Sequence, residues 1–223
     1  MQRMIGNNVR NMGAGGRTAA DKAATEGNGT SKSWYNWVTK GYATDKWTNT
    51  SADKADSYIM YLGTNDISIY GSFSGDISTD ITIDTSAKTI TVNDNTTSVG
   101  GYCEILNAVF GVQDKARVFC LTLPNYRNDD TTRTEMNNKI KEIINAYKSI
   151  GKYIYLVDIE TYGISKDNIS TWKSIYYTGG HLNVFGYKWL CNFLISYINY
   201  IIENNKKDFV NIEIVDDDNK LDY

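Results

Sequence analysis

Short apolar runs alternate with longer stretches of helical periodicity along this chain, and that alternation restricts the possible folds most strongly. Residues 57–62, 117–123 and 154–157 are compact apolar runs of strand length. Residues 99–110 and 131–150 repeat apolar side chains at spacings of three and four, which predicts amphipathic helices. Strands that alternate with helices favour parallel pairing, because parallel strands need a crossover between them. We therefore expect an α/β protein with a central parallel sheet.

The same pattern extends toward both ends of the chain. Residues 9–12 predict a short strand that opens into the glycine-rich turn at 13–16. Residues 19–24 predict a short helix, and residues 184–203 predict the last one.

One segment breaks the α/β rhythm. Between about 79 and 92, apolar and polar residues alternate on both sides of a polar break, which is typical of a β-hairpin inserted into another fold. We expect a single domain over residues 1–204 that contains this hairpin. An acidic C-terminal tail is expected over residues 205–223.

Composition and charge weigh against some classes of partner. The chain has 223 residues, 41% of them hydrophobic, which is enough to bury one sizeable core. Its net charge is −3 and no basic stripe occurs, so we expect no nucleic-acid partner. We expect no membrane span, and the first residues do not resemble a secretion signal. The sequence leaves the compartment and the oligomeric state open.

The few cysteines and the single histidine restrict the chemistry. Cys103, Cys120 and Cys191 fit neither a metal-ligand spacing nor a disulfide framework, and Cys120 lies in an apolar run typical of a buried thiol. His181 is the only histidine. A mechanism that needs a histidine cluster is therefore excluded, and one that needs a single imidazole has one candidate.

Three loops carry the residues best suited to catalysis. Ligands of open α/β sheets bind at the carboxyl ends of strands. The glycine-rich turn at 13–16 follows one predicted strand, and Gly63-Thr64-Asn65-Asp66 follows another. A glycine backbone amide and a neutral asparagine amide are donors that stabilise an oxyanion. The third loop, at 178–183, holds His181 ahead of the last helix, where an imidazole can act as a general base.

Each of these signals also has a purely structural interpretation. Gly63-Thr64-Asn65-Asp66 could be only a turn, because Asn and Asp favour turns. The glycine-rich run could be a tight strand-to-helix turn, and a single loop histidine could be incidental. Their occurrence together, in one order and at strand ends, favours the catalytic interpretation.

Three motifs together resemble the conserved blocks of the SGNH (GDSL-like) hydrolases. Residues 11–18, Asn-Met-Gly-Ala-Gly-Gly-Arg-Thr, resemble the second block. Residues 61–66, Tyr-Leu-Gly-Thr-Asn-Asp, match the Gly-x-Asn-Asp of the third block, and residues 179–187 resemble the fifth block. The resemblance covers roughly residues 1–200 and implies a three-layer α/β/α fold with a flavodoxin-like parallel sheet.

The resemblance implies a role for each motif residue. Gly16 would donate its backbone N–H to an oxyanion hole and Asn65 its side-chain amide, while His181 would be the general base and acid. Asp66 would support the loop. Thr178 stands where the family usually has the aspartate that orients the histidine, so it could accept a hydrogen bond but could not stabilise an imidazolium by charge. No metal or organic cofactor is implied.

The family's first block, Gly-Asp-Ser, carries the nucleophilic serine and does not occur in this sequence. The Gly-Asp-Ile-Ser at 75–78 is only superficially similar, because it belongs to the inserted hairpin region. In the family the first block precedes the second by a strand, a loop and a helix, whereas only residues 1–8 precede the first predicted strand here. We expect an N-terminally incomplete domain whose sheet lacks its first strand, which is central in the strand order 2-1-3-4-5.

Three hypotheses for the function follow. The first is a serine ester hydrolase, with a carbohydrate deacetylase as one option. Its N-terminal segment would be missing, so that this chain alone is inactive. The second is a catalytically inactive module that binds a glycan or an ester. The third is an unrelated α/β protein or a structural part of a larger particle.

The expected substrate is a small-molecule or carbohydrate ester. Aromatic residues near the strand-end loops favour a carbohydrate because their rings could stack on sugars, although a tyrosine-rich composition explains them equally well. These residues are Tyr70, Tyr126, Tyr162, Tyr176, Tyr177, Trp34, Trp37 and Trp47.

Overall fold

The chain folds into two compact units. The sheet unit contains residues 11–123 and 131–156, and the C-terminal unit contains residues 1–10, 124–130 and 157–223. The structure is a computed structural model that describes residues 9, 11–13, 15–22, 32–39, 54–124, 131–163, 169–178 and 181–210.

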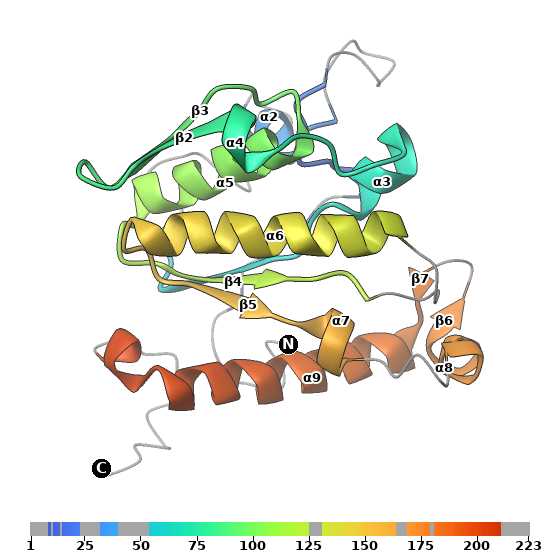
Figure 1. The fold of residues 1–223 in the computed structure, drawn as a ribbon. Helices are drawn as coiled ribbons and strands as arrows, with labels where there is room; N and C mark the ends of the chain where they lie inside the picture. Colours follow the sequence, from blue (N-terminus) through green and yellow to red (C-terminus); the bar gives the residue numbers. More distant parts are fainter. Residues whose placement is uncertain are drawn as a thin grey trace. The chain divides into compact units, whose positions relative to one another are not determined.

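Three parallel strands form the centre of the sheet unit (Figure 1). They are β1 (Ser57–Met60), β4 (Arg117–Leu121) and β5 (Ile154–Val157), in the order β1-β4-β5. Ser57 lies opposite Arg117 and Met60 opposite Cys120 in the parallel register of β1 and β4. All five residues of β4 are buried, as expected for the middle strand of a parallel sheet. The predicted α/β class with a parallel sheet is confirmed.

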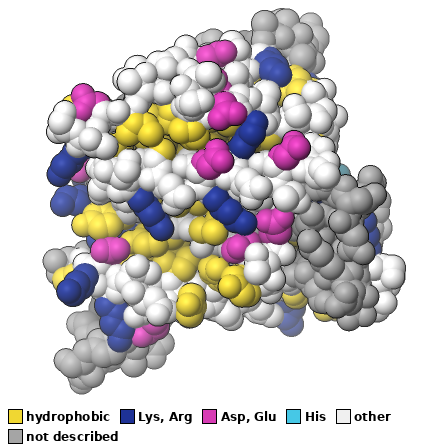
Figure 2. All heavy atoms as spheres, viewed as in Figure 1, with side chains coloured by type: hydrophobic (Ala, Val, Ile, Leu, Met, Phe, Trp, Pro, Cys, Tyr) yellow, Lys and Arg dark blue, Asp and Glu magenta, His cyan; other side chains and the backbone are white. Residues whose placement is uncertain are grey.

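Two long helices, α5 (Ser98–Val112) and α6 (Thr131–Ser149), lie on one face of this sheet (Figure 1). The apolar spacing that predicted α6 corresponds to its buried stripe of Met136, Ile140, Ile143, Ile144 and Tyr147. Two shorter helices in the same unit are α2 (Trp34–Thr39) and α3 (Thr64–Tyr70). On the face seen in Figure 2, the acidic and basic side chains of the sheet unit are interspersed.

The inserted hairpin is confirmed. β2 (Ile81–Asp84) and β3 (Thr89–Val92) pair in antiparallel register, with Ile81 opposite Val92, and the short helix α4 (Ile77–Asp80) precedes them. Ile81 and Ile90 are buried and Val92 is half-buried, but Ile83 is 37% exposed. The apolar alternation that predicted the hairpin therefore corresponds to burial in β3, but only at Ile81 in β2.

Two predicted elements near the N-terminus are wrong. Residues 9 and 11–13 form no strand, and the carbonyl of Met12 accepts a hydrogen bond from Trp34 Nε1 at 2.9 Å. Residues 19–22 form no helix, because three successive amides donate to distant acceptors instead. Ala19 and Ala20 donate to the Asp66 carboxylate, and the Asp21 N–H donates to the Asn95 carbonyl.

The C-terminal unit contains the histidine loop and the last helix. Its elements are α7 (Ile159–Tyr162), α8 (Ile169–Tyr176), β6 (Tyr177–Thr178), β7 (His181–Leu182), α9 (Val184–Asn204) and a 3₁₀ helix (Lys206–Phe209). Of the predicted tail, residues 211–223 lie outside the described residues. Among the helices that the structure describes, none has the length and apolarity to cross a membrane.

Candidate functional site

The glycine loop, residues 15–20, lies in the sheet unit and is anchored on several sides. Gly16 has φ 73°, a left-handed conformation that glycine adopts without steric cost. Thr18 forms an isolated parallel bridge with Ser33, donating to the Lys32 carbonyl at 3.0 Å. Among described atoms, none lies within 4 Å of an added Gly16 Cβ, so a ligand has room to approach this stretch of backbone.

The Gly63–Asp66 loop comes directly after β1 and opens α3. Gly63 precedes the helix with φ 118°, and an added Cβ would collide with the Met136 side chain, so this position requires glycine. Asn65 Nδ2 donates to the Arg17 carbonyl at 2.9 Å. The side-chain amide of Asn65 is thereby held against the glycine loop, 48 residues away in sequence.

Asp66 joins the same two loops from inside the protein. It is 0% exposed, and its carboxylate accepts hydrogen bonds from Ala19 N at 2.8 Å, Ala20 N at 3.0 Å and Ser98 Oγ at 2.9 Å. Burial raises the pKa of this carboxyl, and the hydrogen bonds from Ala20, Ala19 and Ser98 offset part of that rise. Asp66 therefore links the glycine loop to the start of α5.

Ser98 is a residue that the sequence analysis missed. It is fully buried at the start of α5, and it donates to Asp66 across 32 residues. The sequence marks only the start of the helix, through Thr97, whose hydroxyl accepts from Gly100 N. No local sequence pattern predicts the hydrogen bond from Ser98 to Asp66.

His181 belongs to the C-terminal unit, where it is exposed on β7. Thr178 lies directly opposite it on β6 in the antiparallel register. Thr178 is therefore the cross-strand neighbour of the histidine.

Asn183 fixes the base of the histidine loop. Its N–H donates to the Tyr176 carbonyl and its Nδ2 to the Ile175 carbonyl, both at 2.8 Å, while its Oδ1 accepts from Gly186 N at 3.0 Å. Asn183 thus caps α9 and binds the end of α8 at once. An asparagine ahead of an apolar helix is a recognised cap signal, so sequence reasoning could have found half of this role.

The structure therefore groups the predicted site residues into two sets. Gly16, Asn65 and Asp66 lie together in the sheet unit, and Thr178 and His181 lie together in the C-terminal unit.

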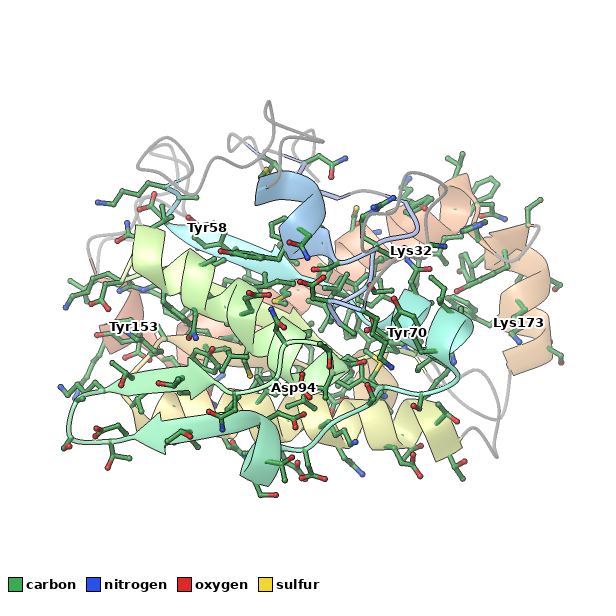
Figure 3. The ribbon with its side chains drawn as sticks, turned by 90° about the horizontal axis from the view of Figure 1, so that it is seen from above. Lys32, Tyr58, Tyr70, Asp94, Tyr153 and Lys173 are labelled. Carbon is green, nitrogen blue, oxygen red and sulfur yellow. The ribbon has the colours of Figure 1, made fainter. Side chains whose placement is uncertain are left out.

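Several of the aromatic residues considered for sugar stacking contact other groups, among them Tyr70, Tyr162, Tyr176 and Tyr177. The ring of Tyr70, labelled in Figure 3, lies 4.5 Å from Lys22 Nζ. Tyr176 and Tyr177 contact Trp172, with ring centroids 5.1 and 5.5 Å apart. Tyr162 is 68% exposed. Tyr126, Trp47 and the side chain of Trp37 lie outside the described residues.

The buried thiols are poor nucleophiles in this structure. Cys120 is fully buried, as predicted, and Cys103 is also buried. Burial raises the pKa of each thiol to about 12, so the reactive thiolate is scarce near neutral pH. Within the described residues, no three His, Cys, Asp or Glu side chains gather closely enough to hold a metal ion.

Comparison with known proteins identifies relatives. A family model described as GDSL-like Lipase/Acylhydrolase matches residues 2–194. No curated protein matches the sequence. A family 3 carbohydrate esterase of Clostridium thermocellum is 17% identical, with a TM-score of 0.45 over 73% of this chain and 64% of its own. One from Talaromyces cellulolyticus is also 17% identical, with a TM-score of 0.48 over 76% of this chain and 68% of its own.

The chain thus spans about two thirds of the length of these two solved structures. The family match covers most of the chain and includes all three motif loops, which confirms the resemblance found in the sequence. The chain belongs to the GDSL-like lipase/acylhydrolase family.

Proposed function

We propose that this chain supplies the oxyanion donors and the general base of a serine ester hydrolase. The observation that supports the proposal most strongly is the union of two motif loops. Asn65 donates to the backbone of the glycine loop, and Asp66 accepts two amides from it. A backbone N–H at Gly16 and the second amide hydrogen of Asn65 are thereby held close together, as two oxyanion donors must be.

The proposed reaction is acyl transfer to water. A serine Oγ attacks the ester carbonyl while His181 takes its proton, and the negative oxygen rests on Gly16 N–H and Asn65 Nδ2. The proton on His181 then passes to the leaving alcohol. Water attacks the acyl-enzyme with His181 again as the base, and the acid leaves as the serine is restored.

The serine is the part of the proposal that this sequence does not contain, since Gly-Asp-Ser is absent from it. The sheet offers a place for a further strand that would carry it. Among the described strands, β1 is paired only with β4. Asp56 bonds to β4 through its carbonyl, so the backbone N–H and C=O of Ile59 face the edge of β1 away from β4. An open edge of this kind accepts another strand.

We propose a small-molecule or carbohydrate ester as the substrate. The preference for a carbohydrate rested on aromatic rings, and it is weakened because Tyr176 and Tyr177 pack on Trp172. Tyr162 is 68% exposed, and its ring centroid lies 5.9 Å from that of Tyr197.

The alternative is an inactive binding module with the same loops. Thr178 opposite His181 favours it, because a neutral partner cannot stabilise an imidazolium by charge. Such a module would bind an ester or a glycan without turning it over.

Hydrolysis of p-nitrophenyl acetate separates the two functions. This chain alone should show no burst of acyl-enzyme formation and no labelling by a serine-reactive phosphonate. With a Gly-Asp-Ser segment restored ahead of residue 1, the protein should hydrolyse the ester. Activity should then be lost in His181→Ala and fall by roughly 10² to 10³ in kcat in Asn65→Ala. Asn65→Asp should be at least as damaging, because it adds negative charge at the oxyanion.

Three outcomes would contradict the proposal. Phosphonate labelling of this chain alone would mean that the nucleophilic serine lies within residues 1–223 and not in an added Gly-Asp-Ser segment. A restored protein that binds the ester but does not turn it over would favour the binding module. If Asn65→Ala leaves kcat unchanged in an active restored protein, the Gly63–Asp66 loop is only a turn and supplies no oxyanion donor.

A further inference from the structure

The inserted hairpin ends in a root that touches the glycine loop. The root consists of residues 74–80 and 93–98. The Asp21 N–H, just after the glycine loop, donates to the Asn95 carbonyl of the root at 2.8 Å. In α5, which follows the root, an added Cβ on Gly101 would collide with the Ala19 carbonyl, so helix and loop are in close contact.

Asp80 joins the two segments of the root by hydrogen bonds. It is buried, and its carboxylate accepts from Asp76 N at 2.8 Å, from Thr79 Oγ1 at 2.8 Å and from Thr97 Oγ1 at 2.6 Å. Its backbone carbonyl accepts from Asn93 N at 2.7 Å. One side chain therefore joins the segment that enters the hairpin to the segment that leaves it.

A continuous series of hydrogen bonds and one peptide bond connects Asp80 to the glycine loop. Thr97, bonded to Asp80, is followed by Ser98, whose Oγ donates to Asp66 Oδ1 and accepts from Ser74 N at 3.1 Å. Asp66 in turn accepts the amides of Ala19 and Ala20. In Figure 3, Asp94 lies at the end of the hairpin beside the first turn of α5, where Gly100 leaves room for its carbonyl.

A surface hairpin attached for stability alone would not need this connection. Its strands could pack on α5 through Ile81 and Ile90 while its root ended in solvent. Here Asp80 and Ser98 are buried in a root whose other residues are half-buried or exposed. Ser98 donates to the Asp66 carboxylate, which also accepts the amides of Ala19 and Ala20. Polar groups in such a buried network are costly to leave unpaired, so the parts of the network hold one another in place.

We propose that the inserted segment 76–97 positions the glycine loop, acting from Asp80 through Thr97 and Ser98 to Asp66. Asp80 and Ser98 are positioning residues, because they act on the glycine loop only through Thr97 and Asp66. The catalytic meaning of this coupling rests on the proposed role of Gly16. The coupling itself does not, and it can be measured in the protein without any activity.

Amide hydrogen exchange at Ala19 and Ala20, resolved by NMR, tests the coupling. Asp80→Asn replaces an acceptor oxygen with a donor and should raise the exchange rates of both amides by roughly tenfold, the effect of losing one buried hydrogen bond. Asp84→Asn is the matched control. Asp84 accepts from Ser86 and Ala87 at the exposed tip of the same hairpin, so its replacement should change the two rates less than about twofold.

Ser98→Ala provides a second variant if Asp80→Asn does not fold. It removes the hydroxyl that links the root to Asp66, and the exchange rates at Ala19 and Ala20 should again rise roughly tenfold. The proposal is overturned if Asp80→Asn speeds exchange within β2 and β3 while the two amides keep their wild-type rates. It is also overturned if Asp84→Asn has the same effect as Asp80→Asn. Loss of esterase activity plays no part in either outcome, so failure of the proposed function stays distinguishable.

Discussion

Asp66 is a carboxylate that the fold removes from water and surrounds with donors. Burial raises its pKa above the ordinary value of 3.8, although hydrogen bonds from Ala20, Ala19 and Ser98 favour the charged form. The folded protein therefore holds this proton more tightly than the unfolded chain does. The stability that Asp66 contributes is fully present below about pH 3.8 and is lost as the pH rises through the raised pKa.

The pH dependence of unfolding checks this sign. In urea titrations, the free energy of unfolding of the wild type minus that of Asp66→Asn should fall as the pH rises from roughly 3 to 7, since only the wild type carries the shifted carboxyl. Other titrating groups cancel in the difference. A difference that rises with pH would mean that hydrogen bonding, rather than burial, dominates at this carboxyl.

Gly63 and Gly71 bracket α3 and differ in what surrounds them. Both have positive φ, 118° and 81°, but an added Cβ meets the Met136 side chain only at Gly63. Gly71→Ala should cost about 1 kcal/mol of stability from backbone strain. Gly63→Ala should cost roughly 2 kcal/mol or more, because strain and collision add. Equal losses in chemical denaturation would show that Met136 does not restrict the loop that presents Asn65.

At the scale of elements, the junction of α8 and α9 rests on Asn183. Asn183→Ala removes the cap of α9 and the bond to Ile175, and should cost about 1 kcal/mol of stability. Asn183→Ser keeps the capping acceptor and should recover most of that loss, but not the bond to Ile175. Asn204→Ala, at the other end of α9, removes an exposed bond to Tyr200 and serves as the control.

His181 reports on the same junction. It is the only histidine, so its ring proton signals in an NMR spectrum need no assignment. Asn183→Ala and Asn183→Ser should both shift these signals, because both remove the side-chain bond to the Ile175 carbonyl of α8. Asn204→Ala should leave the signals unchanged. Signals that stay at the wild-type position in both Asn183 variants would show that Asn183 caps the helix without positioning the histidine.

The elements that local patterns define were predicted, and those that distant contacts define were not. The stripe on α6 and the alternation in β2 and β3 can be read directly from the residues. The short helix expected after the glycine loop fails because Ala19, Ala20 and Asp21 give their amides to residues far along the chain. Periodicity carries no information about such partners.

The same division holds for the site at the scale of the whole molecule. Gly16, Asn65 and His181 could be proposed from the sequence because their motifs resemble conserved blocks of a known family. The strand and the helix expected on either side of the glycine loop were wrong. Ser98 and the root around Asp80 could not, because their roles depend on bonds that cross 17 to 32 residues. The structure places two motif loops in the sheet unit and the third in the C-terminal unit, whereas the sequence predicts one domain. The proposed function requires all three to meet.

The distance between the His181 ring and the Asn65 side-chain amide tests that requirement most directly. A crystal structure of the protein gives this distance without any activity assay. The proposed function predicts that the two groups lie within about 12 Å of each other, on opposite sides of one bound ester carbonyl. A larger separation would mean that base and oxyanion donors do not serve one substrate, and would contradict the proposed function.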